Sequence, residues 1–159
     1  MPITQHETEQ IEKANATERT PVVFIHGLWL LPSSWDNWAA LFEEAGYAPV
    51  TPVWPDDPDT VEQARANPDV FAKKTLGQIA DHTTEVIGKL TKKPAVMGHS
   101  TGGLLTFTIA RQTGPSLSTS RRTLVSNSLR FSAPVDASRE ALASAASTRL
   151  CMVRISSLN

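Results

Sequence analysis

Residues 94–103 read Pro-Ala-Val-Met-Gly-His-Ser-Thr-Gly-Gly, and the prediction of fold and chemistry starts from this stretch. A short apolar run leads into Gly-x-Ser-x-Gly, and apolar residues at helical spacing follow it. This order of strand, motif and helix is the context of a nucleophile elbow, a sharp turn that exposes a reactive serine. Gly98 and Gly102 lack a Cβ atom, so the backbone can pack closely on both sides of Ser100. The helix that follows would direct its free N–H groups toward a developing oxyanion.

A second motif lies upstream of the elbow. Residues 21–25, Pro-Val-Val-Phe-Ile, form an apolar and β-branched run that is typical of a strand buried on both faces. The run ends in His26-Gly27, which precedes Ser100 by 74 residues. That interval has room for two further strand–helix units of ordinary size. Two chemistry-bearing motifs therefore each follow a predicted buried strand.

With these two motifs the chain resembles the α/β-hydrolase family over about residues 20–113. Smaller features of the resemblance are Ser34-Trp35-x-x-Trp38, Gly46-Tyr47 and Pro52-x-Trp54-Pro55. The resemblance implies that Ser100 is the nucleophile and that the backbone N–H groups of Leu28 and Thr101 form the oxyanion hole. It also implies supporting roles for the neighbouring residues His26, Gly27, Gly98, His99 and Gly102. The implied substrate is a small molecule with an ester or related acyl group, and the implied chemistry uses neither a metal nor an organic cofactor.

The element order predicts an α/β fold, with a doubly wound, mostly parallel sheet and helices on both faces. In such a sheet the catalytic residues lie at the carboxyl ends of the strands, where both motifs fall. This would be a partial α/β-hydrolase fold. Strands are expected at residues 21–26, 48–53 and 95–97, and helices at about 35–45, 60–66, 75–91 and 101–112.

Composition divides the chain into three parts. Residues 1–19 are polar and predict a solvated N-terminal tail, whereas residues 20–113 correspond to the N-terminal half of a hydrolase domain. Residues 114–159 are rich in Ser, Arg and Ala, contain six Arg and no Lys, and show no motif of the family. Weak patterns there allow a strand at 123–125, a helix at 136–149 and a final strand at 151–155. This change in composition indicates a truncated or frame-shifted end.

Charge and hydropathy exclude several classes of function. The net charge of −1 gives no electrostatic basis for binding nucleic acid or an anionic membrane. No apolar run approaches the ~20 residues of a membrane span, and the absence of a signal peptide predicts a cytoplasmic protein. Cys151 is the single cysteine, so an internal disulfide framework is excluded. The aspartates at 56, 57 and 59 lie among prolines, which favours a turn over a metal site.

The sequence after Ser100 does not supply a complete catalytic triad. In this fold the triad follows the order Ser, then Asp or Glu, then His. Asp136 and Glu140 are the only acids after Ser100, and no histidine follows it. None of the four earlier histidines is expected to act as the base. His6 lies in the tail, and His82 is expected on a half-exposed helix face. His26 is expected to hold the loop backbone, and the His99 side chain should point away from the adjacent serine. We therefore expect little or no hydrolase activity.

Three interpretations account for a predicted nucleophile without an acid and a base. The favoured one is an N-terminal fragment of a full hydrolase. The second is a non-catalytic pseudo-hydrolase that binds a small apolar ligand or a protein partner. The third is half of an assembly in which another chain supplies the acid and the base. The oligomeric state is left open, and the tryptophans at 29, 35, 38 and 54 are expected to form either an apolar pocket wall or core.

Overall fold

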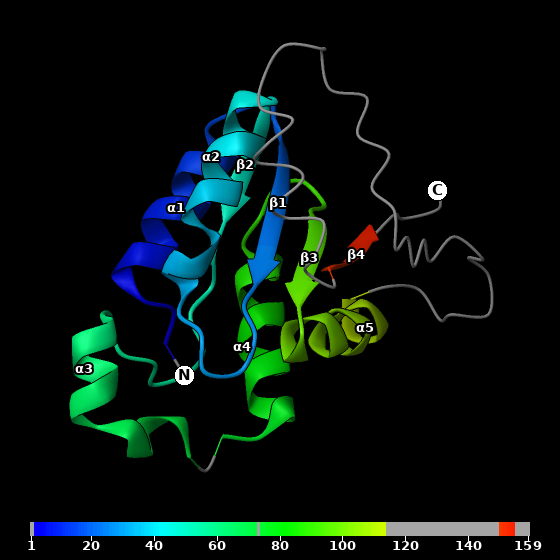
Figure 1. Cartoon of the computed structure of the whole chain (residues 1–159). Helices are drawn as coiled ribbons and strands as arrows, with labels where there is room; N and C mark the ends of the chain where they lie inside the picture. The colour runs from blue at the N-terminus through cyan, green and yellow to red at the C-terminus, as the bar shows by residue number, and fades with distance from the viewer. Residues whose placement is uncertain (1, 73, 114–149, 155–159) are drawn as a thin grey trace.

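A computed structural model describes residues 2–72 and 74–113, together with the backbone of residues 150–154. Figure 1 shows a central sheet with helices packed along it. The predicted strand at 123–125 and the predicted helix at 136–149 lie outside the described residues. No helix in the described ranges is both long enough and apolar enough to cross a membrane.

The sheet is mostly parallel, as predicted. The described strands are β1 (Thr20–Ile25), β2 (Tyr47–Val50), β3 (Ala95–His99) and β4 (Leu150–Arg154), and they lie in the order β2-β1-β3-β4. β1 pairs in parallel with both β2 and β3, whereas β4 runs antiparallel to β3. The last strand thus begins one residue before its predicted position and covers the β3 edge.

Alternate residues of β1 divide the core between the two faces of the sheet. Val22 and Phe24 pack with α2 (Asp36–Glu44) and with the preceding 3₁₀ helix η1 (Pro32–Trp35). Val23 and Ile25 pack on the opposite face with α4 (Leu76–Gly88) and α5 (Thr101–Thr113). Five consecutive residues of β1 are buried because both faces are covered. This arrangement confirms the predicted doubly wound fold.

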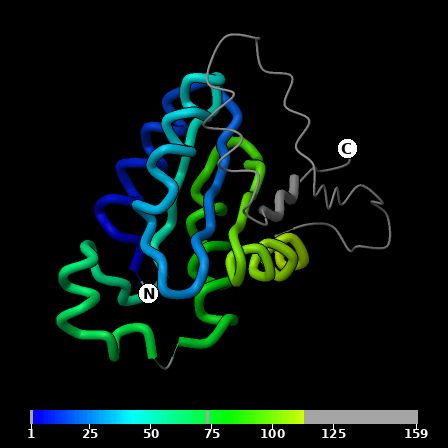
Figure 2. The backbone as a smooth tube through the Cα atoms, viewed as in Figure 1, coloured from blue at the N-terminus to red at the C-terminus, as the bar shows by residue number. Residues whose placement is uncertain are grey.

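Local signals place the helix ends close to the predictions. Thr60 caps α3 (Val61–Ala66), and a capping box of Thr75 and Gln78 starts α4. The predicted helix at 35–45 begins with the 3₁₀ turn because Pro32 is favoured in a first turn. Figure 2 shows that α3 and the following 3₁₀ helix η2 (Pro68–Phe71) project from the end of the sheet where β1 and β3 finish.

The predicted N-terminal tail is wrong. Residues Gln5–Asn15 form a helix, α1, which a capping box of Thr4 and Glu7 begins. Its sparse apolar residues, Ile11 and Ala14, are nevertheless buried in the core. The polar composition predicted a solvated segment, but this helix contacts the sheet edge largely through polar side chains.

Two polar side chains of α1 bond to the backbone that follows β2. The Thr51 N–H donates to Gln10 Oε1 at 2.8 Å, and the Val53 N–H donates to Glu7 Oε1 at 3.1 Å. These N–H groups are two residues apart, the spacing at which one side of an extended chain exposes its donors. α1 therefore supplies acceptors that a neighbouring strand would otherwise provide, which protects this edge from pairing with another chain.

Glu7 also joins α1 to α4. Its Oε1 lies 2.9 Å from Nε2 of His82, and both side chains are buried. The predicted half-exposed position of His82 is therefore wrong. Burial alone would raise the pKa of Glu7, but hydrogen bonds from His82 and Thr4, with the charge of His82, outweigh it and lower the pKa from its ordinary value.

We expect Glu7→Gln to lower the free energy of unfolding by about 3 kcal/mol at neutral pH, because the amide keeps only one acceptor oxygen and turns an NH₂ group toward buried donors that the carboxylate accepts from. The lowered pKa means that the carboxylate's contribution is present above the ordinary value of 4.5 and is lost as pH falls through the folded value. Urea denaturation at neutral pH and in acid measures both effects. Glu12→Gln, an exposed change on the same helix, is the control, and equal behaviour of the two variants would contradict the assignment.

Candidate functional site

Ser100 occupies the junction between β3 and α5 in a strained conformation. Its φ of 54° lies in the left-handed region, as do the φ angles of two other described non-glycine residues, Trp29 and Asp56. An L-residue in this region costs roughly 1–2 kcal/mol, and such strain persists where surrounding packing enforces it. The Ser100 carbonyl accepts from the N–H groups of Gly103 and Leu104, at 2.9 and 3.3 Å, so the helix starts directly at the serine.

The two glycines of the motif allow backbone to contact backbone. A Cβ atom on Gly98 would lie 2.2 Å from the carbonyl oxygen of Gly102. A Cβ atom on Gly102 would lie 2.2 Å from the carbonyl oxygen of Ile25, at the end of β1. Either side chain would force the first turn of α5 away from the sheet. The sequence motif is therefore a steric requirement of this turn.

The loop after β1 lies against the turn between β3 and α5. Gly27 is so close that a Cβ atom on it would lie 3.2 Å from Cβ of Ser100 and 3.0 Å from Nδ1 of His99. The Gly27 carbonyl accepts from the Leu30 N–H at 3.1 Å and closes a turn in which Trp29 has a φ of 67°. This bond uses neither the Leu28 nor the Trp29 N–H group. The structure thus brings together the two motifs that the sequence separates by 74 residues.

His26 is packed beneath this turn. Its ring is 1% exposed and stacks on Trp54, with ring centroids 4.8 Å apart. Nδ1 lies 3.1 Å from the Gly27 carbonyl oxygen, and Nε2 lies 3.4 Å from Oδ2 of Asp57. Burial, opposed by the Gly27 hydrogen bond and reinforced by the charge of Lys74, lowers the pKa of His26 to about 4. The imidazole is therefore neutral at neutral pH.

Asp57 and Lys74 are the part of this site that sequence reasoning missed. The Asp57 side chain is 1% exposed, and its Oδ1 lies 2.5 Å from Nζ of Lys74, which is itself 8% exposed. Burial raises the pKa of Asp57 despite the opposing contacts with Lys74. The sequence indicated only a turn at the aspartates, because a partner 17 residues away leaves no local pattern. Among the described residues, no cluster of His, Cys, Asp or Glu is arranged to hold a metal ion.

The other histidines are distributed around the molecule. His6 is exposed on α1, and His82 is paired with Glu7. His99 is half-buried, and its Nδ1 has no hydrogen-bond partner in the described ranges. No hydrogen bond joins any of the four histidines to Ser100 within those ranges. The structure therefore provides no evident general base from these side chains.

The tryptophans do not form one pocket wall. Trp35 and Trp38 pack with Phe24 and Phe42 in the core, on the face that α2 covers. Trp54 lies under His26, and only Trp29 is largely exposed, at 66%. The Trp29 ring contacts Phe71 edge-on, with centroids 5.5 Å apart. The expected aromatic wall beside the serine is thus reduced to Trp29 and its partner from η2.

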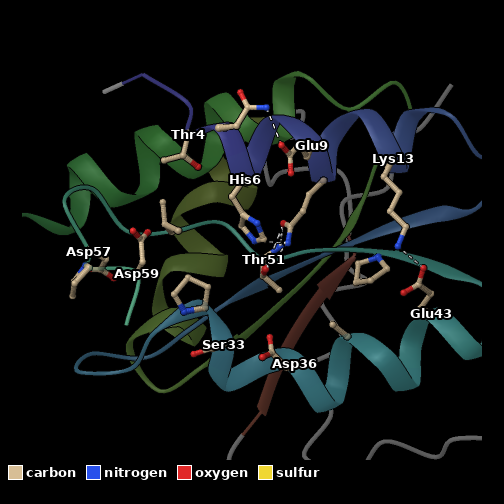
Figure 3. Close-up of a pocket in the computed structure, with 17 residues that line it drawn as sticks. Thr4, His6, Glu9, Lys13, Ser33, Asp36, Glu43, Thr51, Asp57 and Asp59 are labelled. Carbon is tan, nitrogen blue, oxygen red and sulfur yellow. Dashed lines mark hydrogen bonds and ion pairs between the residues drawn. The ribbon is translucent and has the colours of Figure 1, made fainter. Parts of the chain in front are cut away.

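A separate groove lies between α1 and α2. Its volume is about 820 Å³, and Figure 3 shows polar side chains from both helices facing into it. The ion pair of Lys13 and Glu43, at 2.7 Å, joins the two helices across the groove. Asp57 lines this groove and also contacts His26, but no residue of the turn between β3 and α5 or of the loop after β1 lines it. The groove is therefore distinct from the Ser100 region.

Comparison with known families identifies the family of this chain. The chain matches the alpha/beta hydrolase family over residues 22–154, and it belongs to that family. The match continues beyond residue 113 into the Ser- and Arg-rich segment. Comparisons with curated proteins and with solved structures found no significant match.

We expect Gly98→Ala to lower the free energy of unfolding by about 3 kcal/mol or more, because its Cβ would overlap the backbone of α5. Gly88→Ala is the matched control. A Cβ on Gly88 meets nothing within 4 Å, and alanine is the better helix former by about 1 kcal/mol. Urea denaturation of both variants measures the difference, and similar stabilities would contradict the close contact at the elbow.

The neutral state of His26 predicts a pH dependence of stability. Its folded pKa of about 4 lies below the ordinary 6.5, so the unfolded chain binds the proton more tightly. The stabilising contribution is present above pH 6.5 and is lost as pH falls toward about 4, an effect on the order of 3 kcal/mol. Denaturation from neutral pH into acid should show this loss in the wild type and in the exposed control His6→Gln. His26→Gln should lack it, and a retained loss would contradict the burial of a neutral imidazole.

Proposed function

We propose that the chain is a serine hydrolase that acts on an ester or a related acyl substrate through an acyl-enzyme on Ser100. The observation that carries this proposal is the left-handed Ser100 at a strand–helix junction, packed against the turn that follows β1. A strained serine between two sterically required glycines is the geometry of a nucleophile elbow. Family membership supports the same assignment.

The proposed reaction is acyl transfer to water. The Ser100 oxygen attacks the substrate carbonyl carbon, and the serine proton passes through solvent water to the departing alcohol, since no side chain is assigned as the base. The N–H groups of Leu28 and Thr101 would stabilise the oxyanion, since the turn at 27–30 does not use the first and the first turn of a helix leaves the second free. Water then hydrolyses the acyl-enzyme and regenerates the serine.

The remaining site residues support the nucleophile and the oxyanion hole in this proposal. Gly98 and Gly102 allow the elbow to pack, and Gly27 allows the loop to approach Ser100. His26 holds the loop backbone through its Nδ1. His99 precedes the nucleophile and lies against Gly27. Because the buried, neutral His26 is engaged in the loop, we do not assign it as the base.

A fluorophosphonate probe tests the proposal directly. We expect covalent labelling of the wild type, loss of labelling in Ser100→Ala, and unchanged labelling in Ser33→Ala, which alters an exposed serine of η1. Mass spectrometry of the labelled peptide identifies the site. Ester turnover should be slow, because catalysis without a complete triad retains only ~10³–10⁴ over water. Equal labelling of wild type and Ser100→Ala would refute the role of Ser100.

A second candidate is a non-catalytic module that binds a small apolar ligand or a protein partner. The absence of any histidine after Ser100 favours it, because a serine hydroxyl is a weak nucleophile without a base. This candidate predicts no labelling of the wild type, together with retained binding of an aryl or aliphatic acyl compound. The labelling experiment therefore separates the two functions.

A further inference from the structure

The segment between β2 and α4 holds the loop after β1 at two points. Trp54 and Asp57 contact His26, at the start of the loop. Phe71, from η2, contacts Trp29 at the apex of the turn. These contacts come from residues that are not adjacent in sequence to the loop that they hold.

Lys74 connects these two anchor points. Its Nζ lies 2.5 Å from Oδ1 of Asp57 and 5.5 Å from the ring centroid of Phe71. The first contact is an ion pair that is nearly closed to solvent, and the second places a cation over an aromatic face. A single ammonium group thus contacts the partner of His26 and the partner of Trp29.

We propose that Lys74 and Asp57 are positioning residues of the oxyanion loop: their ion pair fixes the Asp57 carboxylate beside Nε2 of His26, and the ring, packed between this carboxylate and Trp54, directs its Nδ1–H at the Gly27 carbonyl and sets the direction of the Leu28 N–H. The inference rests on the proposed function, because it assigns that N–H group to the oxyanion hole. Neither Lys74 nor Asp57 contacts Ser100 in this scheme. Both act through the loop.

The hydrogen positions follow from the contacts of His26. The Gly27 carbonyl and the Asp57 carboxylate can both only accept, but the contact at Nδ1, at 3.1 Å, has hydrogen-bond geometry and the contact at Nε2, at 3.4 Å, does not; the hydrogen is therefore assigned to Nδ1. Neutral His26 then has a bare Nε2, which faces Oδ2 of Asp57; neither atom has a hydrogen-bond donor among the described residues. A proton between these two atoms would pair them, and the positive charge of Lys74 opposes its binding. Burial is the main reason that the ring is neutral, and the positive charge of Lys74 acts in the same direction.

Two charged side chains act on the pair of His26 and Asp57. Lys74 contacts Asp57 and its charge lowers the pKa of His26, whereas the charge of Asp56 raises the pKa of Asp57. A buried ammonium is costly to desolvate, and an apolar side chain would fill the same space without that cost. The presence of a charged lysine here is therefore better explained by its interaction with Asp57 and His26 than by packing alone.

The test replaces Lys74 with Met, which keeps much of the side-chain length and removes the charge. Lys74→Arg restores the charge, and Lys92→Met is the matched control because it breaks an ion pair with Glu18 before β1 and β3, at the opposite end of the sheet. Far-UV circular dichroism checks the fold of each variant. The readouts are the ¹⁵N signals of the His26 ring during a pH titration, the amide signals of Gly27 and Leu28, and the rate of fluorophosphonate labelling at Ser100.

In Lys74→Met we expect the pKa of His26 to rise by about one unit, the two loop amides to shift, and the labelling rate to fall about tenfold. Lys74→Arg should restore all three, and Lys92→Met should leave them unchanged. Unchanged His26 and loop signals in a folded Lys74→Met variant would overturn the inference, since a merely structural lysine would not affect the proton of His26. If the wild type is not labelled, the proposed hydrolase function fails, while the magnetic-resonance readouts still decide whether Lys74 controls the loop.

Discussion

The close approach of Gly102 to the end of β1 is the constraint on which the candidate site depends. A Cβ atom at this position would meet the carbonyl oxygens of Ile25 and His26 at 2.2 and 2.6 Å. The first turn of α5 therefore rests directly on the backbone that leads into the loop of Gly27. This contact sets the serine, the helix N-terminus and the loop at backbone distance from one another.

Strain on both sides of this contact is maintained by rigid surroundings. Ser100 and Trp29 both adopt left-handed backbone conformations, one between β3 and α5 and one in the facing turn after β1. Parallel pairing of β1 with β3 brings Ile25 opposite Gly98, so the two strained segments start from neighbouring strand ends. The core on both faces of the sheet can hold this geometry because close-packed interiors resist small displacements.

The polar helix α1 shows why part of the fold escaped prediction. Amphipathic periodicity identifies a helix that buries an apolar face, and it located α4 to within a few residues. α1 buries mainly Glu7, Ile11 and Ala14, and it contacts the edge of the sheet through Glu7 and Gln10. A buried carboxylate resembles a solvated one in sequence, because its partners lie 46 and 75 residues away.

The sequence by itself determined the alternation of strands and helices, the two glycine-flanked motifs and their positions after buried strands. These features are local, since hydrophobic period, caps and glycine spacing act over a few residues. Only the tertiary structure decided the partners of buried charged groups: Glu7 with His82, and Asp57 with Lys74 and His26. Such pairs join segments that the fold brings together, and their energetic role depends on burial. Burial belongs to the packed chain, so no local pattern of residue types encodes it.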